Sequence, residues 1–258
     1  MLIKVNGLII HEIAQKENDK FITILTAEYG KMSVYCRGVR KIKSQFMSLI
    51  ELFSYNEFEL YEKNGHFWLD DCYRINDFYK LRDTIEGFSL ASYILDVLSD
   101  ISLEGEKCED VLRLGLNTLY AICEKIKPLW QIKAAFEFKA MCLSGYLPEL
   151  DGCRRCGKKL DKYTFDVLSG CLVCDKCKGI AVSDYVDFDH FDFKAPFFEM
   201  NNTLVDILRF VQGAALNRFL LFDIPNEPEQ KAFSRFCELY LLSHLERGFQ
   251  TLSFYNSL

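Results

Sequence analysis

Five of the eleven cysteines lie close together in the second half of the chain. Cys153 and Cys156 form one Cys-x-x-Cys pair, and Cys171, Cys174 and Cys177 form a run in which two such pairs overlap. Two residues between cysteines let both thiolates point into one tight turn, and two such turns supply four sulfurs to a tetrahedral ion. The spacing therefore predicts a structural zinc site.

One cysteine of the run must be spare, because a tetrahedral ion takes four ligands. Using Cys174 and Cys177 as the second pair leaves 17 residues between the pairs, inside the zinc-ribbon range of about 15 to 20. Using Cys171 and Cys174 leaves 14. We therefore expect the ligands to be Cys153, Cys156, Cys174 and Cys177. Because thiolates fill all four places, the zinc should hold a fold and activate no water.

Other chemistry fits these cysteines less well. The remaining six are scattered along the chain, and its first residues lack a signal-peptide pattern, which favours reduced thiols in the cytoplasm over disulfides. A redox Cys-x-x-Cys needs one pair and normally opens a helix after a strand, which neither pair does convincingly. An iron–sulfur cluster uses the same four thiolates, so it stays open as an alternative.

The length of 258 residues, half of them apolar, suggests two domains or one domain with an insert. No apolar run is long enough to span a bilayer, so we expect a soluble protein without a membrane role. The net charge of −6 argues against a protein that coats nucleic acid through its overall field. A local basic patch can still bind nucleic acid, so the position of the charges matters more than their sum.

Residues 1 to about 79 predict a small β-barrel. Five runs rich in β-branched and aromatic residues are expected to be strands, at 2–13, 20–30, 31–39, 49–65 and 66–75. Asn64-Gly65 between the last two is a strong type I′ hairpin signal. Five short antiparallel strands suit an OB-fold, and an SH3-like barrel fits the count equally well.

A basic segment separates the third and fourth predicted strands. Between Gly30 and Ser44 there are five cations and no acid: Lys31, Arg37, Arg40, Lys41 and Lys43. Such a segment is either a solvated loop or a site for phosphates, whose neutralisation releases counterions. The nearby rings of Tyr29, Tyr35 and Phe46 favour nucleic acid, since bases stack on aromatic side chains beside a basic groove. Tyr35 could instead face the barrel interior.

The periodicity becomes helical from about residue 80. We expect helices within 81–100, 108–126, 127–145, 201–213 and 226–248, irregular chain or short elements at 182–199, and an unstructured tail or docking segment at 249–258. His190 has no nucleophile pattern around it, and the chain holds no phosphate-binding glycine loop and no protease or hydrolase motif, which predicts a protein that is not an enzyme. The expected class is α+β, with a barrel at 1–79 and a helical domain at 80–258 that carries a ribbon insert at about 150–180.

The order of these parts resembles the RecO family of bacterial recombination mediators, over essentially the whole chain. The family has a Gly-x-x-basic-x-x-Ser run in its barrel, here GVRKIKS from Gly38 to Ser44, followed by an apolar stretch, here MSLIELFSY. It also has a Cys-x-x-Cys-Gly motif, an aromatic residue, and then Gly-Gly-x-x-Cys-x-x-Cys. In this chain Cys171 follows Gly170 where the family has its second glycine, which agrees with Cys171 as the spare cysteine.

The resemblance implies an OB-fold barrel that binds single- and double-stranded DNA in the cytoplasm, in association with the nucleoid. It assigns this role to Arg40, Lys41 and Lys43 inside the matching motif and to the adjoining Arg37, whereas Lys31 depends on charge alone. It also implies strand annealing and, with RecR, help to RecA in replacing single-stranded DNA-binding protein on gapped DNA. The acidic tail of the latter would dock in the helical region, with Lys133, Lys139 and Arg209 as candidates. Two alternatives are an interaction subunit whose basic loop contacts a partner's acidic face, and a nucleic-acid enzyme with an unrecognised site.

Overall fold

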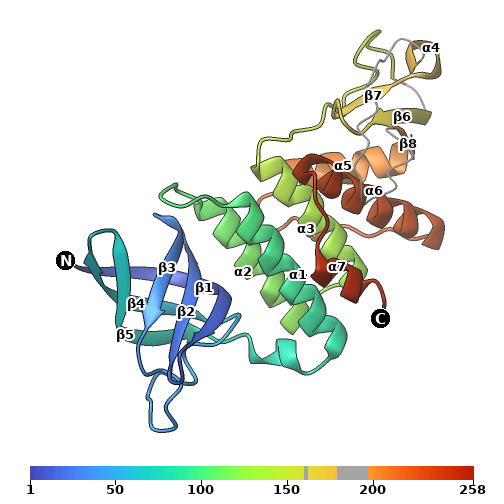
Figure 1. Ribbon diagram of the computed structural model, residues 1–258. Helices are drawn as coiled ribbons and strands as arrows, with labels where there is room; N and C mark the ends of the chain where they lie inside the picture. The colour runs from blue at the N-terminus through green and yellow to red at the C-terminus, as the bar shows by residue number, and fades with distance from the viewer. Residues whose placement is uncertain (160–161, 179–196) are drawn as a thin grey trace. The chain divides into compact units, whose positions relative to one another are not determined.

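The computed structural model describes residues 1–159, 162–178 and 197–258 (Figure 1). Contacts within the chain divide it into two compact units, residues 1–126 together with 250–258, and residues 127–249. His190 and most of the segment expected to be irregular, 182–196, lie outside the described residues. Among the helices that the structure describes, none combines the length and apolarity needed to cross a bilayer.

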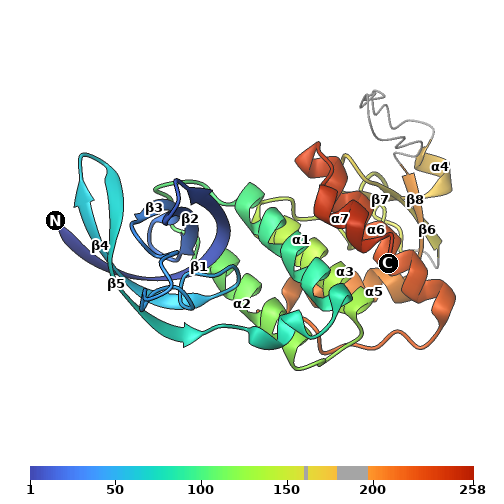
Figure 2. The ribbon, with the colours of Figure 1, turned by 60° about the horizontal axis from the view of Figure 1, so that its bottom comes forward.

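Five strands close into a barrel in the first unit, and Figure 2 shows the long first strand curving around it. The strands follow the spatial order β1-β2-β3-β5-β4 and have the bounds β1 (Leu2–Gln15), β2 (Asp19–Thr26), β3 (Gly30–Cys36), β4 (Tyr55–Lys63) and β5 (His66–Asn76). One half of β1 pairs with β4 and the other half with β2, while β3 and β5 close the barrel as a parallel pair. The expected OB-like barrel is confirmed.

Alternation of apolar and polar residues places one face of every strand inside the barrel. The interior is filled by branched and aromatic side chains, among them Ile9, Ile24, Val34, Phe58 and Leu60. At the tip between β4 and β5, Asn64 and Gly65 have φ of 54° and 76°. Both residues of a type I′ turn need positive φ, so the predicted hairpin is confirmed.

The barrel packs against two helices of its own unit, α1 (Ile85–Ile101) on β1 and α2 (Glu109–Cys123) on β2, and the short 3₁₀ helix η1 (Tyr79–Arg82) packs on both helices. Gly30 lies where β3 meets the chain after α1. A Cβ there would come within 2.0 Å of the Leu103 carbonyl oxygen, and its φ of 61° also favours glycine. The compact unit thus extends beyond the boundary near residue 79 that composition suggests, and that boundary stays a prediction.

The last residues of the chain are helical. They form α7 (Gln250–Tyr255), which packs against α1 with Leu252 buried, and the Thr251 hydroxyl donates a 2.7 Å hydrogen bond to the Asp96 carboxylate. Of the two alternatives for this tail, the unstructured one is wrong, and a docking role stays a prediction. A six-residue helix is too short to be stable by itself, so only its packing on α1 reveals it.

The second unit joins a helical core to a small sheet. Its elements are α3 (Leu129–Leu143), β6 (Lys162–Asp166), β7 (Cys171–Val173), α4 (Asp175–Lys178), β8 (Phe197–Asn201), α5 (Asn202–Gly213) and α6 (Glu227–Leu245). The sheet order is β7-β6-β8. Phe165 of β6 packs against Phe236 and Tyr240 of α6, with ring centroids 5.0 and 5.9 Å apart. This aromatic contact attaches the sheet to the helices.

Two lysines of α3 are buried and have structural partners. Lys133 lies between Glu137 and Glu238, with N–O distances of 2.8 and 2.6 Å. The Lys139 ammonium donates to three carbonyl groups at the end of α5, those of Val211, Gln212 and Ala214. Buried ammonium groups need such partners. The suggestion that these two lysines dock an acidic tail is therefore wrong, since neither reaches the surface.

Candidate metal centre and nucleic-acid interface

The four predicted cysteine ligands come together in the second unit. The Sγ atoms of Cys153, Cys156, Cys174 and Cys177 all lie within 4.8 Å of one another, and those of Cys156 and Cys174 are 3.8 Å apart. A tetrahedral zinc ion with Zn–S distances of about 2.3 Å places its sulfurs about 3.8 Å apart. The cluster can therefore hold a metal ion, and Cys171 is not a member of it.

Backbone hydrogen bonds shape the two cysteine turns. In the first turn the Cys153 N–H donates to the Lys158 carbonyl (3.0 Å) and the Gly157 N–H to the Cys153 carbonyl (2.8 Å). In the second, the Cys177 N–H donates to the Cys174 carbonyl (2.8 Å). The Arg154 N–H reaches the carbonyl of Leu172 in β7 at 2.9 Å, which holds the first turn beside the second. The sulfurs are thus brought together by the chain itself.

The electrostatics of the cluster suit a cation. Burial opposes ionisation of Cys153, but N–H groups of Cys156, Cys174 and Arg155 donate to its sulfur and lower the pKa of this thiol to about 6. A hydrogen bond with Cys174, followed by burial, raises the pKa of Cys177 to about 12. The pKa of one thiol is thus lowered and that of another is raised within the same cluster. A divalent ion bound there would favour the thiolate form of its cysteine ligands.

Cys171 has a different environment. It opens β7, paired with Asp166 of β6 and bridged to Glu149, and its side chain is buried. Burial raises the pKa of its thiol. It is a buried strand residue outside the four-sulfur cluster, which agrees with its prediction as the spare cysteine.

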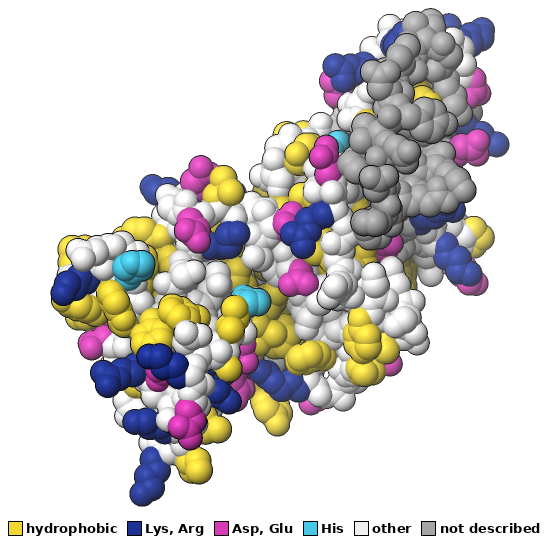
Figure 3. Space-filling view, in the orientation of Figure 1, with side chains coloured by type: hydrophobic (Ala, Val, Ile, Leu, Met, Phe, Trp, Pro, Cys, Tyr) yellow, Lys and Arg dark blue, Asp and Glu magenta, His cyan; other side chains and the backbone are white. Residues whose placement is uncertain are grey.

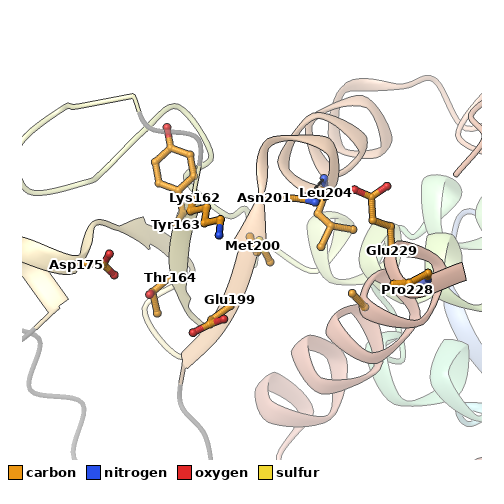
Figure 4. Close-up of a pocket in the computed structure, with 11 residues that line it drawn as sticks. Lys162, Tyr163, Thr164, Asp175, Glu199, Met200, Asn201, Leu204, Pro228 and Glu229 are labelled. Atoms are coloured by element: carbon orange, nitrogen blue, oxygen red, sulfur yellow. Dashed lines mark hydrogen bonds between the residues drawn. The ribbon is translucent and has the colours of Figure 1, made fainter. Parts of the chain in front are cut away.

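A cavity of about 460 Å³ lies next to the sheet of the second unit (Figure 4). Its charged lining comprises one cation, Lys162, and three acids, Asp175, Glu199 and Glu229. Glu229 already accepts a 2.7 Å hydrogen bond from the side-chain amide of Asn201. An acidic lining repels phosphates, so this cavity is a poor candidate for binding nucleic acid.

The better candidate is the loop after β3, whose residues 37–44 we call the basic loop. Its fixed point is Val39, which is buried in the barrel core together with Ile50 from the same β3–β4 connection. Its charged side chains face solvent: Arg37, Arg40, Lys41 and Lys43. Ile42 is 95% exposed. A core anchor thus leaves the four cations on the surface.

Hydrogen bonds of the Asp19 carboxylate and of the loop's own backbone shape the basic loop. The Asp19 carboxylate accepts hydrogen bonds from the Gly38 N–H (2.7 Å) and the Tyr35 hydroxyl. The Tyr35 bond, followed by that of Gly38, lowers the pKa of Asp19, so it stays ionised. The Arg40 N–H donates to the Asn18 carbonyl at 3.0 Å. The turn between β1 and β2 therefore holds the loop in place.

The cationic side chains of the basic loop make few interactions with other described residues. Within the part of the chain that the structure describes, no ion pair joins Lys41 or Lys43 to a carboxylate. The Arg40 guanidinium has a weak contact with the Lys16 carbonyl at 3.4 Å, and Arg37 lies near Asp19. Lys and Arg side chains stand out on the barrel in Figure 3. Charges without internal partners are free to neutralise phosphates.

Lys31 is separated from this group. Its ammonium donates a 2.7 Å hydrogen bond to the Ser99 carbonyl near the end of α1, and the residue is half-buried. Of the three nearby aromatics, Phe46 packs against the barrel core, and Tyr29 belongs to the turn between β2 and β3. Tyr35 lies on the outer face of β3, because its neighbours Val34 and Cys36 face inward. The structure thus places four of the five predicted cations together on the basic loop, with the Tyr35 ring on the strand that leads into it. Lys31 and the other two rings lie elsewhere.

Comparison with known proteins covers nearly the whole chain. A family model described as "Recombination protein O N terminal" matches residues 1–76, and one described as "Recombination protein O C terminal" matches residues 82–253. A DNA repair protein RecO of Acetivibrio thermocellus is 31% identical over 68% of this chain and 70% of its own length. A DNA repair protein RecO of Thermoanaerobacter sp. is 29% identical over 100% of this chain and 98% of its own.

Proposed function

The chain belongs to the RecO family of DNA repair proteins, and we propose that it is a recombination mediator that binds single- and double-stranded DNA through its basic loop. The observation that carries this proposal is the exposure of Arg37, Arg40, Lys41 and Lys43 on a loop whose shape is held by other groups. Binding DNA then costs no internal ion pair of Lys41 or Lys43 and gains the release of counterions.

The mediator role has three parts. The protein anneals complementary strands, acts together with RecR, and helps RecA replace single-stranded DNA-binding protein on gapped DNA. None of these steps needs a covalent reaction, and the protein acts without being an enzyme. The four-thiolate closure of the cysteine cluster supports this assignment, because a closed site leaves no coordination place for a substrate.

The metal of the cysteine cluster is zinc in this proposal. Four sulfur ligands in two turns are typical of structural zinc. The 3.8 Å between the sulfurs of Cys156 and Cys174 equals the sulfur–sulfur distance expected around tetrahedral zinc, about 3.8 Å. Zinc would hold the two turns to each other and to the sheet of the second unit.

The test of the DNA interface removes its charge. In the variant Arg37→Ala, Arg40→Ala, Lys41→Ala and Lys43→Ala, we expect weaker binding of single strands at low salt. The slope of log affinity against log salt should fall by up to about 3, because each lost phosphate contact removes about 0.7. Titration by fluorescence anisotropy measures both quantities, and circular dichroism checks the fold.

Annealing of complementary oligonucleotides without nucleotide separates this function from the alternative of an interaction subunit. The purified protein should anneal, and the quadruple variant should anneal more slowly. A wild-type protein that neither anneals nor binds either form of DNA would refute the proposal. An unchanged salt slope in the variant would refute the basic loop as its site.

A further inference from the structure

A row of aromatic side chains crosses the outside of the barrel next to the basic loop. In the register of the sheet, Phe21 of β2 is opposite Tyr35 of β3, Tyr35 is opposite Trp68 of β5, and Trp68 is opposite Tyr61 of β4. Residues directly opposite each other project from the same face. Four neighbouring strands therefore each contribute one ring to what we call the aromatic row.

The rings of the aromatic row make few contacts with one another beyond pairwise packing. The centroids of Phe21 and Tyr35 are 5.0 Å apart with their planes at 55°, and those of Tyr61 and Trp68 are 6.2 Å apart at 47°. Phe21 and Tyr61 are 42% and 48% exposed. Tyr35 and Trp68 between them are half-buried. Four large rings that are exposed in whole or in part on one surface mark a candidate interaction site.

Charged side chains stand at both borders of the aromatic row. On β3, Arg37 of the basic loop comes two positions after Tyr35, and the register places Glu59 of β4 and Asp71 of β5 on the same border. On the other border, Lys63 of β4 is opposite His66 of β5, and both are exposed. Arg37 therefore connects the aromatic row to the basic loop, and Lys63 supplies a second cation at the far border.

We propose that the aromatic row stacks the bases of single-stranded DNA while the basic loop holds their phosphates. This inference rests on the DNA-binding function proposed above and adds a preference for unpaired strands. Stacking on rings needs bases whose faces are free, which a duplex does not offer, whereas phosphates are present in both forms. The basic loop therefore binds both single- and double-stranded DNA, and the aromatic row gives the preference for single strands.

The size of the aromatic row fits a short stretch of single strand. Four rings on adjacent strands span three inter-strand spacings, about 14 Å in all. At roughly 3.4 Å per nucleotide along a helical strand, this covers about four nucleotides, and fewer when the strand is stretched. Hydrophobic and basic side chains lie side by side on the barrel in Figure 3.

Trp68 provides a direct probe of stacking. The chain has two tryptophans, Trp68 and Trp130, so Trp130→Phe leaves a single emitter inside the aromatic row. In the full-length Trp130→Phe protein, binding of an oligothymidine should quench or shift the emission of Trp68. Duplex of matched length, bound to the same extent by anisotropy, should change it much less.

Substitution within the row should affect the two forms of DNA differently. Phe21→Thr with Tyr61→Thr removes two rings and places a β-branched, strand-forming residue at each position. We expect oligothymidine affinity to fall by at least about 5-fold, since one base stacked on a ring is worth roughly 5- to 100-fold. Duplex affinity should stay within twofold.

The matched control is Tyr73→Thr, which removes a ring of similar exposure (51%) from β5 outside the row. It should leave both affinities unchanged. If oligothymidine binds with no change in Trp68 emission and with equal affinity for the double variant, the aromatic row is not a stacking surface and the basic loop alone binds DNA. If neither oligothymidine nor duplex binds the parent protein, the proposed function itself fails.

Discussion

The cysteine cluster and the basic loop both concentrate charge of one sign, but they achieve it in opposite ways. In the cluster, four sulfurs converge within 4.8 Å, and backbone N–H groups stabilise a thiolate. In the basic loop, four cations diverge into solvent from an anchor at Val39. Convergent charge needs an internal ion to be stable, whereas divergent charge remains available for an external one. Substitutions should therefore cost stability in the first region and affinity in the second.

The largest effect is expected in the cluster. Cys174→Ser removes a proposed zinc ligand, whereas Cys171→Ser changes an equally buried cysteine three residues earlier. We expect Cys174→Ser to bind zinc more weakly, with a lower zinc content, and to lose about 3 kcal/mol of unfolding free energy, because it removes one of four ligands that share the roughly 10–16 kcal/mol supplied by structural zinc. Cys171→Ser should keep the zinc and lose about 1 kcal/mol, the cost of burying a hydroxyl.

Elemental analysis and chemical denaturation measure these two quantities. Equal zinc loss in both serine variants would show that Cys171 is a ligand. The comparison between the regions also predicts that Cys174→Ser keeps duplex DNA affinity within twofold. A large loss of affinity would mean that the ribbon takes part in DNA binding.

The next effect compares two lysines of the barrel. Lys43→Ala should lower the salt slope of single-strand binding by about 0.7 with no loss of stability, since its ammonium is exposed. Lys31→Ala should leave the slope unchanged and cost about 1 kcal/mol, because Lys31 donates to the Ser99 carbonyl near the C-terminus of α1. Salt titrations and urea denaturation of both variants test this prediction. A lower salt slope for Lys31→Ala would show that Lys31 also contacts DNA.

The smallest effect concerns the shape of the basic loop. Gly38 has a φ of 69°, and a Cβ there would meet only the Lys41 side chain at 3.6 Å. Gly38→Ala should therefore cost only about 1–2 kcal/mol of backbone strain and weaken DNA binding severalfold as the loop adjusts. Gly65→Ala at the β4–β5 tip, with a φ of 76° and open space around it, should cost the same stability and leave affinity unchanged. Equal DNA affinities of the two variants would show that the shape of the basic loop does not affect DNA binding.

The sequence-based predictions were correct where the interactions join residues close together in the sequence, and they failed where the interactions join distant residues. The cysteine ligands and the Asn64-Gly65 hairpin depend on residues a few positions apart or on the length of one loop, and the structure confirms the convergence of the first and the geometry of the second. The helix at Gln250–Tyr255 was missed because it forms against α1, more than a hundred residues away. Its composition by itself has no strong helical signal.

Partners of charged side chains were equally invisible in the sequence. Lys133 and Lys139 look like surface lysines on an apolar helix, and only the packing of α5 and α6 shows them buried with carboxylates and carbonyl groups. The aromatic row had a weak signal in the alternation of β4 and β5, where Tyr61 and Trp68 occupy outward positions. Their alignment with Phe21 requires the order of strands in the closed barrel.

The amino-acid sequence by itself determined the barrel strands, the four cysteines that come together and the cations of the basic loop, because spacing and periodicity act over short stretches of chain. The tertiary structure decided which side chains remain available. It separated Lys31 from the other cations, buried Lys133 and Lys139, and aligned four rings from four strands. Whether a side chain is exposed and free to bind a ligand depends on contacts between residues far apart in the sequence, and the local sequence pattern does not encode these contacts.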